Sequence, residues 1–159
     1  MLNFNRSGLL VPSSIIASNL KELQSEFITH IGTTERINHF NSYINYSNAL
    51  KILCGNNGLI QWVDGSFVTK MPKPNDIDIV SFIDFQIISS LGNKLQSFKY
   101  PASETIFQVD AYIVPVYPIG HHHFYLTQHD KAYWIDMFDK TRRNRAGNRL
   151  SKGFLEIIY

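Results

Sequence analysis

Residues 64–80 read DGSFVTKMPKPNDIDIV, and this stretch decides the fold. A Gly-Ser turn leads through a proline-broken connection into an apolar strand that the pattern predicts for residues 76–82. Asp76 and Asp78 occupy alternate positions of this strand, so we expect both carboxylates on one of its faces. Two like charges side by side repel each other and are costly to bury, and a divalent cation removes that conflict. Because hard oxygen ligands favour magnesium or manganese, the pair predicts half of a metal site.

A second predicted strand, residues 106–116, carries another carboxylate. Its apolar side chains alternate with polar ones, and Asp110 falls on the polar face. Aspartate is a poor strand former, so its presence needs a reason. It is either an exposed polar residue of an edge strand or a third carboxylate facing Asp76 and Asp78, and the Asp-x-Asp pair favours the second interpretation.

The rest of the pattern predicts a mixed α/β fold, a small sheet with helices packed on it. Asn19 followed by Glu22 resembles a capping box and predicts the start of a helix. After an irregular or extended leader over residues 1–17, we expect helices over 20–31, 35–54, 83–91 and 124–138, and strands over 59–63, 76–82, 106–116 and 154–158. We expect one domain over residues 1–159, with the leader and helices in 1–55 and the sheet core with the site in 59–159.

Composition indicates a globular protein. Of 159 residues, 44% are hydrophobic and 18% are charged, which excludes a disordered chain. The sequence has neither a signal-peptide pattern nor a membrane-spanning apolar run, so we expect a cytoplasmic protein with no membrane partner. Cys54 is the single cysteine, which rules out an internal disulfide, and we expect it to be a small buried apolar residue.

The Gly-Ser turn and the three aspartates together resemble the motif of a known superfamily. Gly65-Ser66, nine intervening residues, Asp76-Ile77-Asp78 and a later strand aspartate resemble the signature of the polymerase-β-like nucleotidyltransferase superfamily. The whole stretch 64–80 is more narrowly similar to a group of small, poorly characterised bacterial nucleotidyltransferase-like proteins of that superfamily. The tail residues Thr141-Arg142, Lys152-Gly153 and Glu156-Ile157 share this similarity. The implied fold is a minimal nucleotidyltransferase fold with the site on one open face of the sheet.

The resemblance implies catalytic and metal-binding roles for the carboxylates. In nucleotidyl transfer an acceptor oxygen attacks the α-phosphorus of a nucleoside triphosphate, and two magnesium ions stabilise the attacking and leaving oxygens. Asp76 and Asp78 would share these ions, with Mn²⁺ as the alternative metal. Asp110 would hold the metal beside the acceptor oxygen and help that oxygen to lose its proton.

The same resemblance implies that the turn binds nucleotide. Gly65 would let the backbone approach the phosphates, and the Ser66 hydroxyl with neighbouring N–H groups would bind the β- and γ-phosphates. Lys70 either reaches the triphosphate or is an exposed loop lysine, and the sequence favours neither. We expect Asp64 to be a strand-end residue beside the site and not a ligand.

Two functions of different class follow. The first is a magnesium-dependent nucleotidyltransferase that moves a nucleoside monophosphate, expected to be AMP, to a protein or RNA hydroxyl. The resemblance places such proteins in bacterial toxin–antitoxin or phage-defence systems, and a partner protein could supply substrate recognition. The alternative is a non-catalytic nucleotide- or RNA-binding module that acts through a partner protein.

Two further clusters leave alternatives open. Six of the fifteen basic residues fall in thirteen positions: Lys140, Arg142, Arg143, Arg145, Arg149 and Lys152. They form a solvated loop, contact the triphosphate or an acidic acceptor, or bind an RNA backbone. The run His121–His123 lacks the spacing of a zinc site, so we expect a loop or helix start there.

Overall fold

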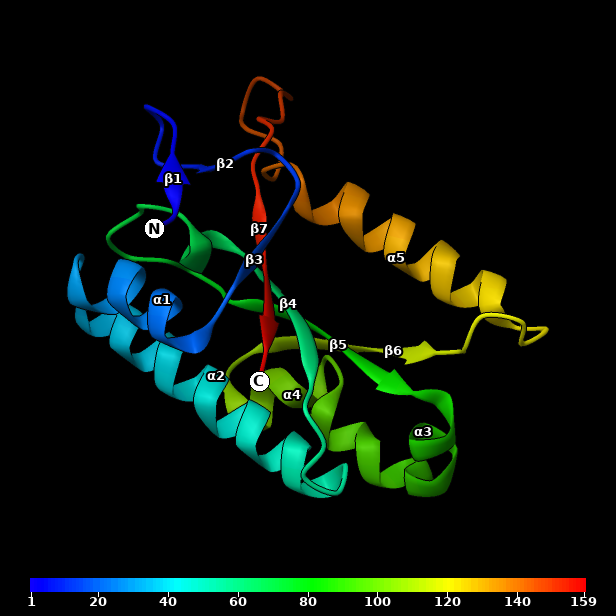
Figure 1. Ribbon diagram of the computed structural model, residues 1–159. Helices are drawn as coiled ribbons and strands as arrows, with labels where there is room; N and C mark the ends of the chain where they lie inside the picture. Colours follow the sequence, from blue (N-terminus) through cyan, green and yellow to red (C-terminus); the bar gives the residue numbers. More distant parts are fainter.

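The computed structural model describes residues 1–159, and a five-stranded mixed sheet lies at its centre (Figure 1). The strands follow the order β3 (Ile15–Ser18), β7 (Phe154–Ile158), β4 (Ile60–Asp64), β5 (Asp78–Asp84) and β6 (Asp110–Val116). β4 runs antiparallel to both of its neighbours, whereas β3 pairs with β7 and β5 pairs with β6 in parallel. The strands β1 (Asn3–Phe4) and β2 (Leu10–Val11) form a separate hairpin. The predicted mixed α/β class is confirmed.

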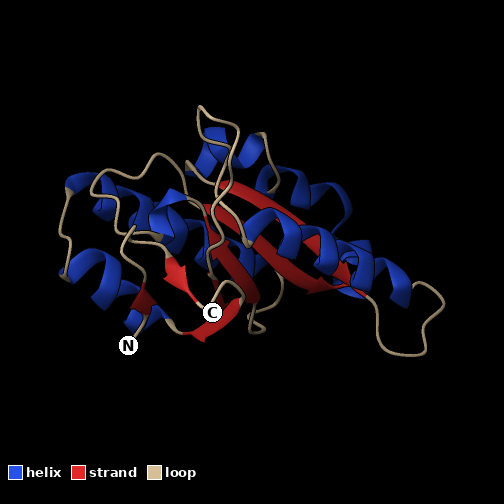
Figure 2. Cartoon of the chain, turned by 90° about the horizontal axis from the view of Figure 1, so that it is seen from above, coloured by secondary structure: helices blue, strands red, loops and turns tan.

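Helices lie on both sides of this sheet (Figures 1 and 2). Helix α5 packs on β6 by itself, away from the other helices. The α-helices are α1 (Leu20–Gln24), α2 (Thr34–Leu53), α3 (Phe85–Leu91), α4 (Ala102–Phe107) and α5 (Phe124–Phe138). A π-helical turn over Ser25–Thr29 extends α1, and 3-10 turns cover Ser66–Val68 and Gly92–Phe98. None of the helices combines the length and apolar character needed to cross a membrane.

The sheet separates two apolar cores because side chains alternate along its strands. Val63, Ile79 and Ala111 occupy one row across β4, β5 and β6 and belong to the larger core, which α1 and α2 cover. The next row, Trp62 and Val80, belongs to the smaller core beneath α5. Side chains two positions along each strand from this second row therefore also point to the α5 face.

Several local predictions are confirmed. Asn19 caps α1, with its side-chain oxygen accepting a hydrogen bond from the Glu22 N–H at 3.0 Å. Helix α2 begins and ends within one residue of the prediction, and α5 and β7 have the predicted bounds. The Asn19 cap marks the start of α1, and the apolar residues at helical spacing indicate α2.

Other boundaries were wrong. The strand predicted from residue 76 begins at Asp78, because Asp76 is bound into the turn at Ser66. The strand predicted from residue 106 begins at Asp110, because α4 ends at Phe107 and Gln108 adopts a left-handed conformation with φ of 60°. The 3-10 turn at 92–98 and α4 were not predicted.

The N-terminal leader and the start of α3 also differ from expectation. Residues 1–17 contain most of a true sheet strand, since β3 pairs in parallel with β7 at the opposite end of the chain. β5 continues to Asp84, whose carboxylate caps α3 by accepting from the Gln86 N–H at 2.7 Å. The helix expected from residue 83 therefore begins at residue 85.

Candidate active site

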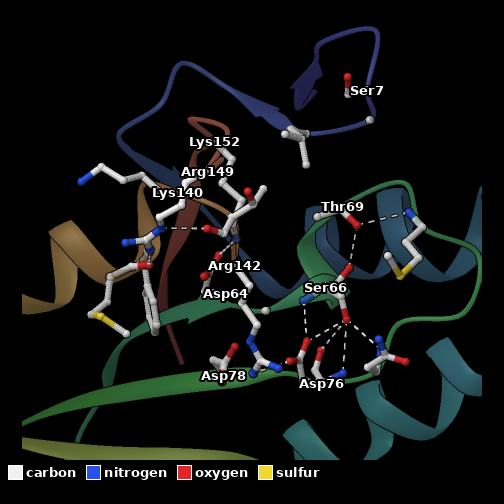
Figure 3. A pocket seen from close by; sticks show the side chains of 18 of the residues that line it. Ser7, Asp64, Ser66, Thr69, Asp76, Asp78, Lys140, Arg142, Arg149 and Lys152 are labelled. Carbon is white, nitrogen blue, oxygen red and sulfur yellow. Dashed lines mark hydrogen bonds and ion pairs between the residues drawn. The ribbon is translucent and has the colours of Figure 1, made fainter. Parts of the chain in front are cut away.

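A cavity of about 1250 Å³ opens on the α5 side of the sheet, where β4 ends and β5 and β6 begin (Figure 3). The N-terminal hairpin loop and the turn after β4 form part of its wall. The C-terminal half of α5 and the loop between α5 and β7 form the rest. Asp76, Asp78, Asp110, Gly65, Ser66 and Lys70, all predicted from the sequence, line this one cavity.

Three aspartates lie in one row across adjacent strands. Asp64, the last residue of β4, pairs in register with Asp78, the first residue of β5. Asp78 pairs in register with Asp110, the first residue of β6. Directly opposed residues of neighbouring strands project to the same side, so all three carboxylates lie on the α5 face. Asp110 therefore faces Asp78 across the sheet, as one of the two sequence interpretations required.

Asp76 lies in the loop before β5 and is held by two partners. Its Oδ1 atom accepts hydrogen bonds from the Ser66 N–H and the Ser66 hydroxyl, each at 2.7 Å. Its Oδ2 atom pairs with the Arg142 guanidinium at 2.9 Å (Figure 3). The Ser66 oxygen also accepts from the Asn75 N–H at 2.7 Å. Ser66 thus fixes the loop that carries Asp76, while its phosphate-binding role stays a prediction.

Gly65 allows the close approach of the turn to the carboxylates. Its φ is 83°, a conformation that side chains disfavour. A Cβ atom at this position would lie 2.9 Å from both the Asp76 carbonyl oxygen and Asp78 Oδ2. Only glycine fits here without displacing the acidic groups.

Arg36 of α2 positions the segment that follows the turn. Its fully buried guanidinium donates to the Phe67 carbonyl at 2.7 Å, to the Met71 carbonyl, and to the Thr69 carbonyl. Burial lowers the pKa of Arg36 to about 10. A charge without a carboxylate partner is satisfied here by backbone oxygens, which fixes the turn relative to α2.

Burial and nearby negative charges raise the pKa values of the three aspartates in this row, Asp64, Asp78 and Asp110. Burial, followed by the charges of Asp76, Asp64 and Asp110, raises the pKa of Asp78 to about 7. Burial also raises the pKa of Asp64 to about 6, although Lys152 opposes the shift. The pKa of Asp110 is raised by burial and then by the charges of Glu104 and Asp76. A cation bound among these groups would relieve both effects.

The carboxylates are not gathered into a ready-made metal site. No group of three or more His, Cys, Asp or Glu side chains is close enough to hold a metal ion. Ser66 and Arg142 already occupy the two carboxylate oxygens of Asp76. The pKa values of Asp78 and Asp110 are raised by burial and by neighbouring charges, and neither carboxylate accepts a hydrogen bond. Both carboxylates are therefore available as oxygen ligands.

The basic cluster divides into members with different roles. Lys152 and Asp64 form a buried ion pair, with 6% of each side chain exposed. Arg142 is 82% exposed and reaches from the loop above the sheet to Asp76. Lys140 and Arg149 also line the cavity. The solvated-loop interpretation is therefore insufficient for these residues, whereas Arg143 and Arg145 do not line the cavity.

Lys70 and the histidine run have local partners. The Lys70 ammonium pairs with Glu26 at 3.5 Å and lies 4.2 Å from the centre of the Phe4 ring. His121–His123 form a turn directly before α5, and the His121 ring stacks on Tyr117 with centroids 5.0 Å apart. The predicted position at a helix start is confirmed for this run.

Sequence reasoning missed two walls of the cavity. The N-terminal hairpin loop lies over the site because the Gly8 carbonyl accepts from the Lys70 N–H at 2.8 Å. Aromatic side chains of α5, among them Tyr133 and Trp134, form another side. The aromatic positions were visible in the sequence, but helical spacing favoured a core role for them.

Searches of curated proteins and of solved structures returned no match to this chain. One family model matches, and it spans residues 2–158, nearly the whole chain and every residue of the site. The chain therefore belongs to the family described as "Family of unknown function (DUF6932)".

Proposed function

We propose that this protein is a magnesium-dependent nucleotidyltransferase of the polymerase-β-like superfamily. It would transfer a nucleoside monophosphate, expected to be AMP, from a nucleoside triphosphate to a hydroxyl of a protein or RNA. Action in the cytoplasm within a bacterial toxin–antitoxin or phage-defence system, with a partner protein, belongs to the same proposal.

One observation carries the proposal: Asp78 and Asp110 lie side by side at adjacent strand starts, with Asp76 two residues before the first. Both strand carboxylates line a cavity that also contains cationic side chains. The cavity, at about 1250 Å³, exceeds the roughly 300–1,000 Å³ of ordinary small-molecule sites. A nucleotide and part of an acceptor could therefore occupy it together.

The donor set suits magnesium, since every candidate ligand is a carboxylate oxygen. Asp78 and Asp110 would bind through oxygens that the protein leaves without hydrogen bonds. Asp76 would join them after its Oδ2 atom exchanges Arg142 for the metal. Two bound magnesium ions would supply charge neutralisation for the attacking and leaving oxygens.

The reaction itself is a substitution at phosphorus. The acceptor oxygen forms a bond to the α-phosphorus, and the bond from that phosphorus to the bridging oxygen breaks, releasing pyrophosphate. Asp110 would hold the metal beside the acceptor oxygen and help that oxygen to lose its proton. Arg142, freed from Asp76, would remain beside the triphosphate and pair with its oxygens.

A specific observation favours the alternative, a nucleotide- or RNA-binding module without turnover. Arg142 already neutralises Asp76, and no three-ligand group is preformed. A binding module would use the same cationic loop for phosphate contacts and would release no pyrophosphate.

The decisive experiment incubates the protein with each α-³²P-labelled nucleoside triphosphate, Mg²⁺ and a cell lysate. Label entering protein or RNA, together with pyrophosphate release, supports the enzyme. The test variants are Asp78→Asn and Asp110→Asn, which remove a charge with little change in side-chain volume. The matched control is Asp84→Asn at the other end of β5, where asparagine can still cap α3.

We expect both test variants to lose transfer and Asp84→Asn to retain it. Transfer that survives in the Asp78→Asn/Asp110→Asn double variant would refute the enzyme. Triphosphate binding without pyrophosphate release in the wild-type protein, with any acceptor, would decide for the binding module.

A further inference from the structure

Three aromatic residues line one side of the cavity: Tyr112 of β6 and Tyr133 and Trp134 of α5. We call them the aromatic wall. Tyr112 follows Asp110 by two positions, so its side chain lies on the same face, about 7 Å further along the strand. All three residues also line a second, smaller cavity of about 340 Å³ on the far side of the wall.

The wall is packed together and yet open to solvent. The Tyr112 and Trp134 ring centroids lie 4.5 Å apart, and those of Tyr133 and Trp134 lie 5.2 Å apart. Trp134 also packs against Phe138, and their ring centroids lie 5.3 Å apart. Tyr133 nevertheless remains 52% exposed. Exposed aromatic faces that a rigid helix holds beside a cavity are suited to stacking a planar ligand.

The other tryptophan shows what a purely structural role looks like in this chain. Trp62 is 2% exposed and lies inside the smaller core. Its indole N–H donates to Glu156 at 2.9 Å. Trp134, in contrast, lines both cavities. Its position suits a ligand as well as the core.

Sheet order sets the orientation of a nucleotide in this cavity. β5 lies between β4 and β6, so the Gly-Ser turn after β4 and Tyr112 of β6 lie on opposite sides of Asp78. On the turn side the Arg142 guanidinium, a cation suited to binding phosphate, pairs with Asp76. Phosphates favour that side, and an aromatic ring favours the wall.

We propose that the aromatic wall binds the nucleobase of the donor nucleoside triphosphate by stacking. This inference rests on the proposed function and assigns its donor-binding side. The Tyr133 and Trp134 rings stand at 81° to each other, so the base would stack on one ring and meet the edge of the other. Its phosphates would then extend toward Asp78 and Asp110. Stacking tolerates every base, because each presents an aromatic face.

The first test measures binding without turnover, by calorimetric titration with ATP and with inorganic tripolyphosphate. Tripolyphosphate carries the same phosphate chain without a base. Tyr133→Ala should weaken ATP binding about 5- to 150-fold, the loss expected for one stacking contact, and leave tripolyphosphate binding unchanged. The control is Tyr125→Ala, a tyrosine of the same helix that is 60% exposed and outside both cavities.

The second test reads Trp134 directly. Trp62→Phe leaves Trp134 as the only tryptophan, since the chain has two. We expect ATP to change the fluorescence of this variant and tripolyphosphate to leave it unchanged. Trp134→Leu, which keeps an apolar side chain against Phe138, should weaken ATP binding in the same way as Tyr133→Ala.

The outcomes separate the two proposals. ATP affinity that is equal in Tyr133→Ala, Trp134→Leu and wild type overturns the wall as a base site. If the two variants lose binding only to an oligoribonucleotide, or only to a protein partner, the wall is also refuted as a base site. Base-dependent binding without any transfer of label refutes the enzyme and leaves the wall standing. If Tyr133→Ala and Trp134→Leu transfer label with the KM of the wild type, the enzyme is supported and the wall is refuted as a base site.

Discussion

Asp78 lies directly opposite Asp110 across the parallel strands β5 and β6, with neither carboxylate hydrogen-bonded to the protein. The row extends to Asp64 on the other side of Asp78, where Lys152 balances one charge. Asp78 therefore has two acidic neighbours in the sheet and no basic partner of its own. A fold retains such an arrangement at a cost in stability, which makes its consequences measurable.

The first consequence is a dependence of stability on pH. The pKa of Asp78 is about 7 in the folded protein against an ordinary 3.8, so between these values the folded state binds more protons than the unfolded state. The free energy of unfolding should therefore fall as pH rises from about 4 to 7, by about 1.4 kcal/mol for each unit of pKa difference. Asp78→Asn should flatten this dependence and stabilise the protein at pH 8.

Urea unfolding at pH 5 and pH 8 checks this expectation. Asp84→Asn is the control and should keep the wild-type slope. If the free energy of unfolding depends on pH equally in Asp78→Asn and in wild type, the raised pKa of Asp78 is contradicted. Some slope should remain in the variant in any case, because the pKa of Asp64 is raised in the same direction, to about 6.

Magnesium should reverse the effect at pH 8. A ligand that binds only the folded state at a hundred times its Kd adds about 2.7 kcal/mol to the free energy of unfolding. We expect Mg²⁺ to raise the Tm of the wild-type protein and to have little effect on Asp78→Asn or Asp110→Asn. At pH 5, where Asp78 is protonated, the shift should also be small. Equal magnesium shifts in all these samples would argue against a carboxylate site.

The sequence predicted the composition of this site better than its geometry. Asp76 and Asp78 were found because an Asp-x-Asp pair in an apolar run is unusual. Asp110 was found because aspartate is a poor strand former and the Asp-x-Asp pair gave it a possible role. Asp76 was nevertheless assigned to a strand, since the pattern could not show that Ser66 holds it in a loop. The pairing of Arg142 with Asp76 joins residues 66 positions apart, which no local pattern encodes.

The same distinction applies to the fold. Helix α5 was predicted with correct bounds from its own residues. Strand β3 was missed, because its four residues gain their structure from pairing with β7, nearly the whole chain away. Asp64 was expected beside the site but not as part of a buried ion pair, because its partner Lys152 comes from the far end of the sequence.

Gly65→Ala should disable the site through contact, and a matched glycine separates contact from backbone strain. Both Gly65 and Gly120 have positive φ, at 83° and 89°. A Cβ atom at Gly65 would lie 2.9 Å from Asp78 Oδ2, whereas at Gly120 it would meet nothing within 4 Å. Gly65, with φ of 83° and ψ of −171°, lies in a region that glycine alone normally occupies, so Gly65→Ala should cost about 1–3 kcal/mol of conformational strain. Gly120→Ala also carries strain, because its φ is positive. Only Gly65→Ala should also lose magnesium binding and transfer, and equal effects of the two variants would refute the contact argument.

Lys152→Met should destabilise the protein by leaving Asp64 buried without a partner. Removing one member of a buried ion pair costs about 3–5 kcal/mol, whereas replacing both members can be nearly neutral. The double variant Asp64→Asn/Lys152→Met should therefore recover much of the loss in urea unfolding. Lys73→Met, which removes an exposed pair with Glu35, is the control and should change little. A double variant no more stable than Lys152→Met would contradict a pairwise role.

Arg142→Ala should separate the binding role of the basic loop from its structural role. The Arg142 side chain is 82% exposed and contacts the acidic cluster only through Asp76, so its removal should leave the free energy of unfolding nearly unchanged. If Arg142 moves from Asp76 to the triphosphate, its loss should weaken ATP and tripolyphosphate binding alike, about tenfold each, and should reduce the salt dependence of both. Arg145→Ala, from the same loop but outside the cavity, should bind both ligands as the wild type does. Calorimetric titration at two salt concentrations measures these effects, and tighter binding of ATP to Arg142→Ala would show that the arginine blocks the site.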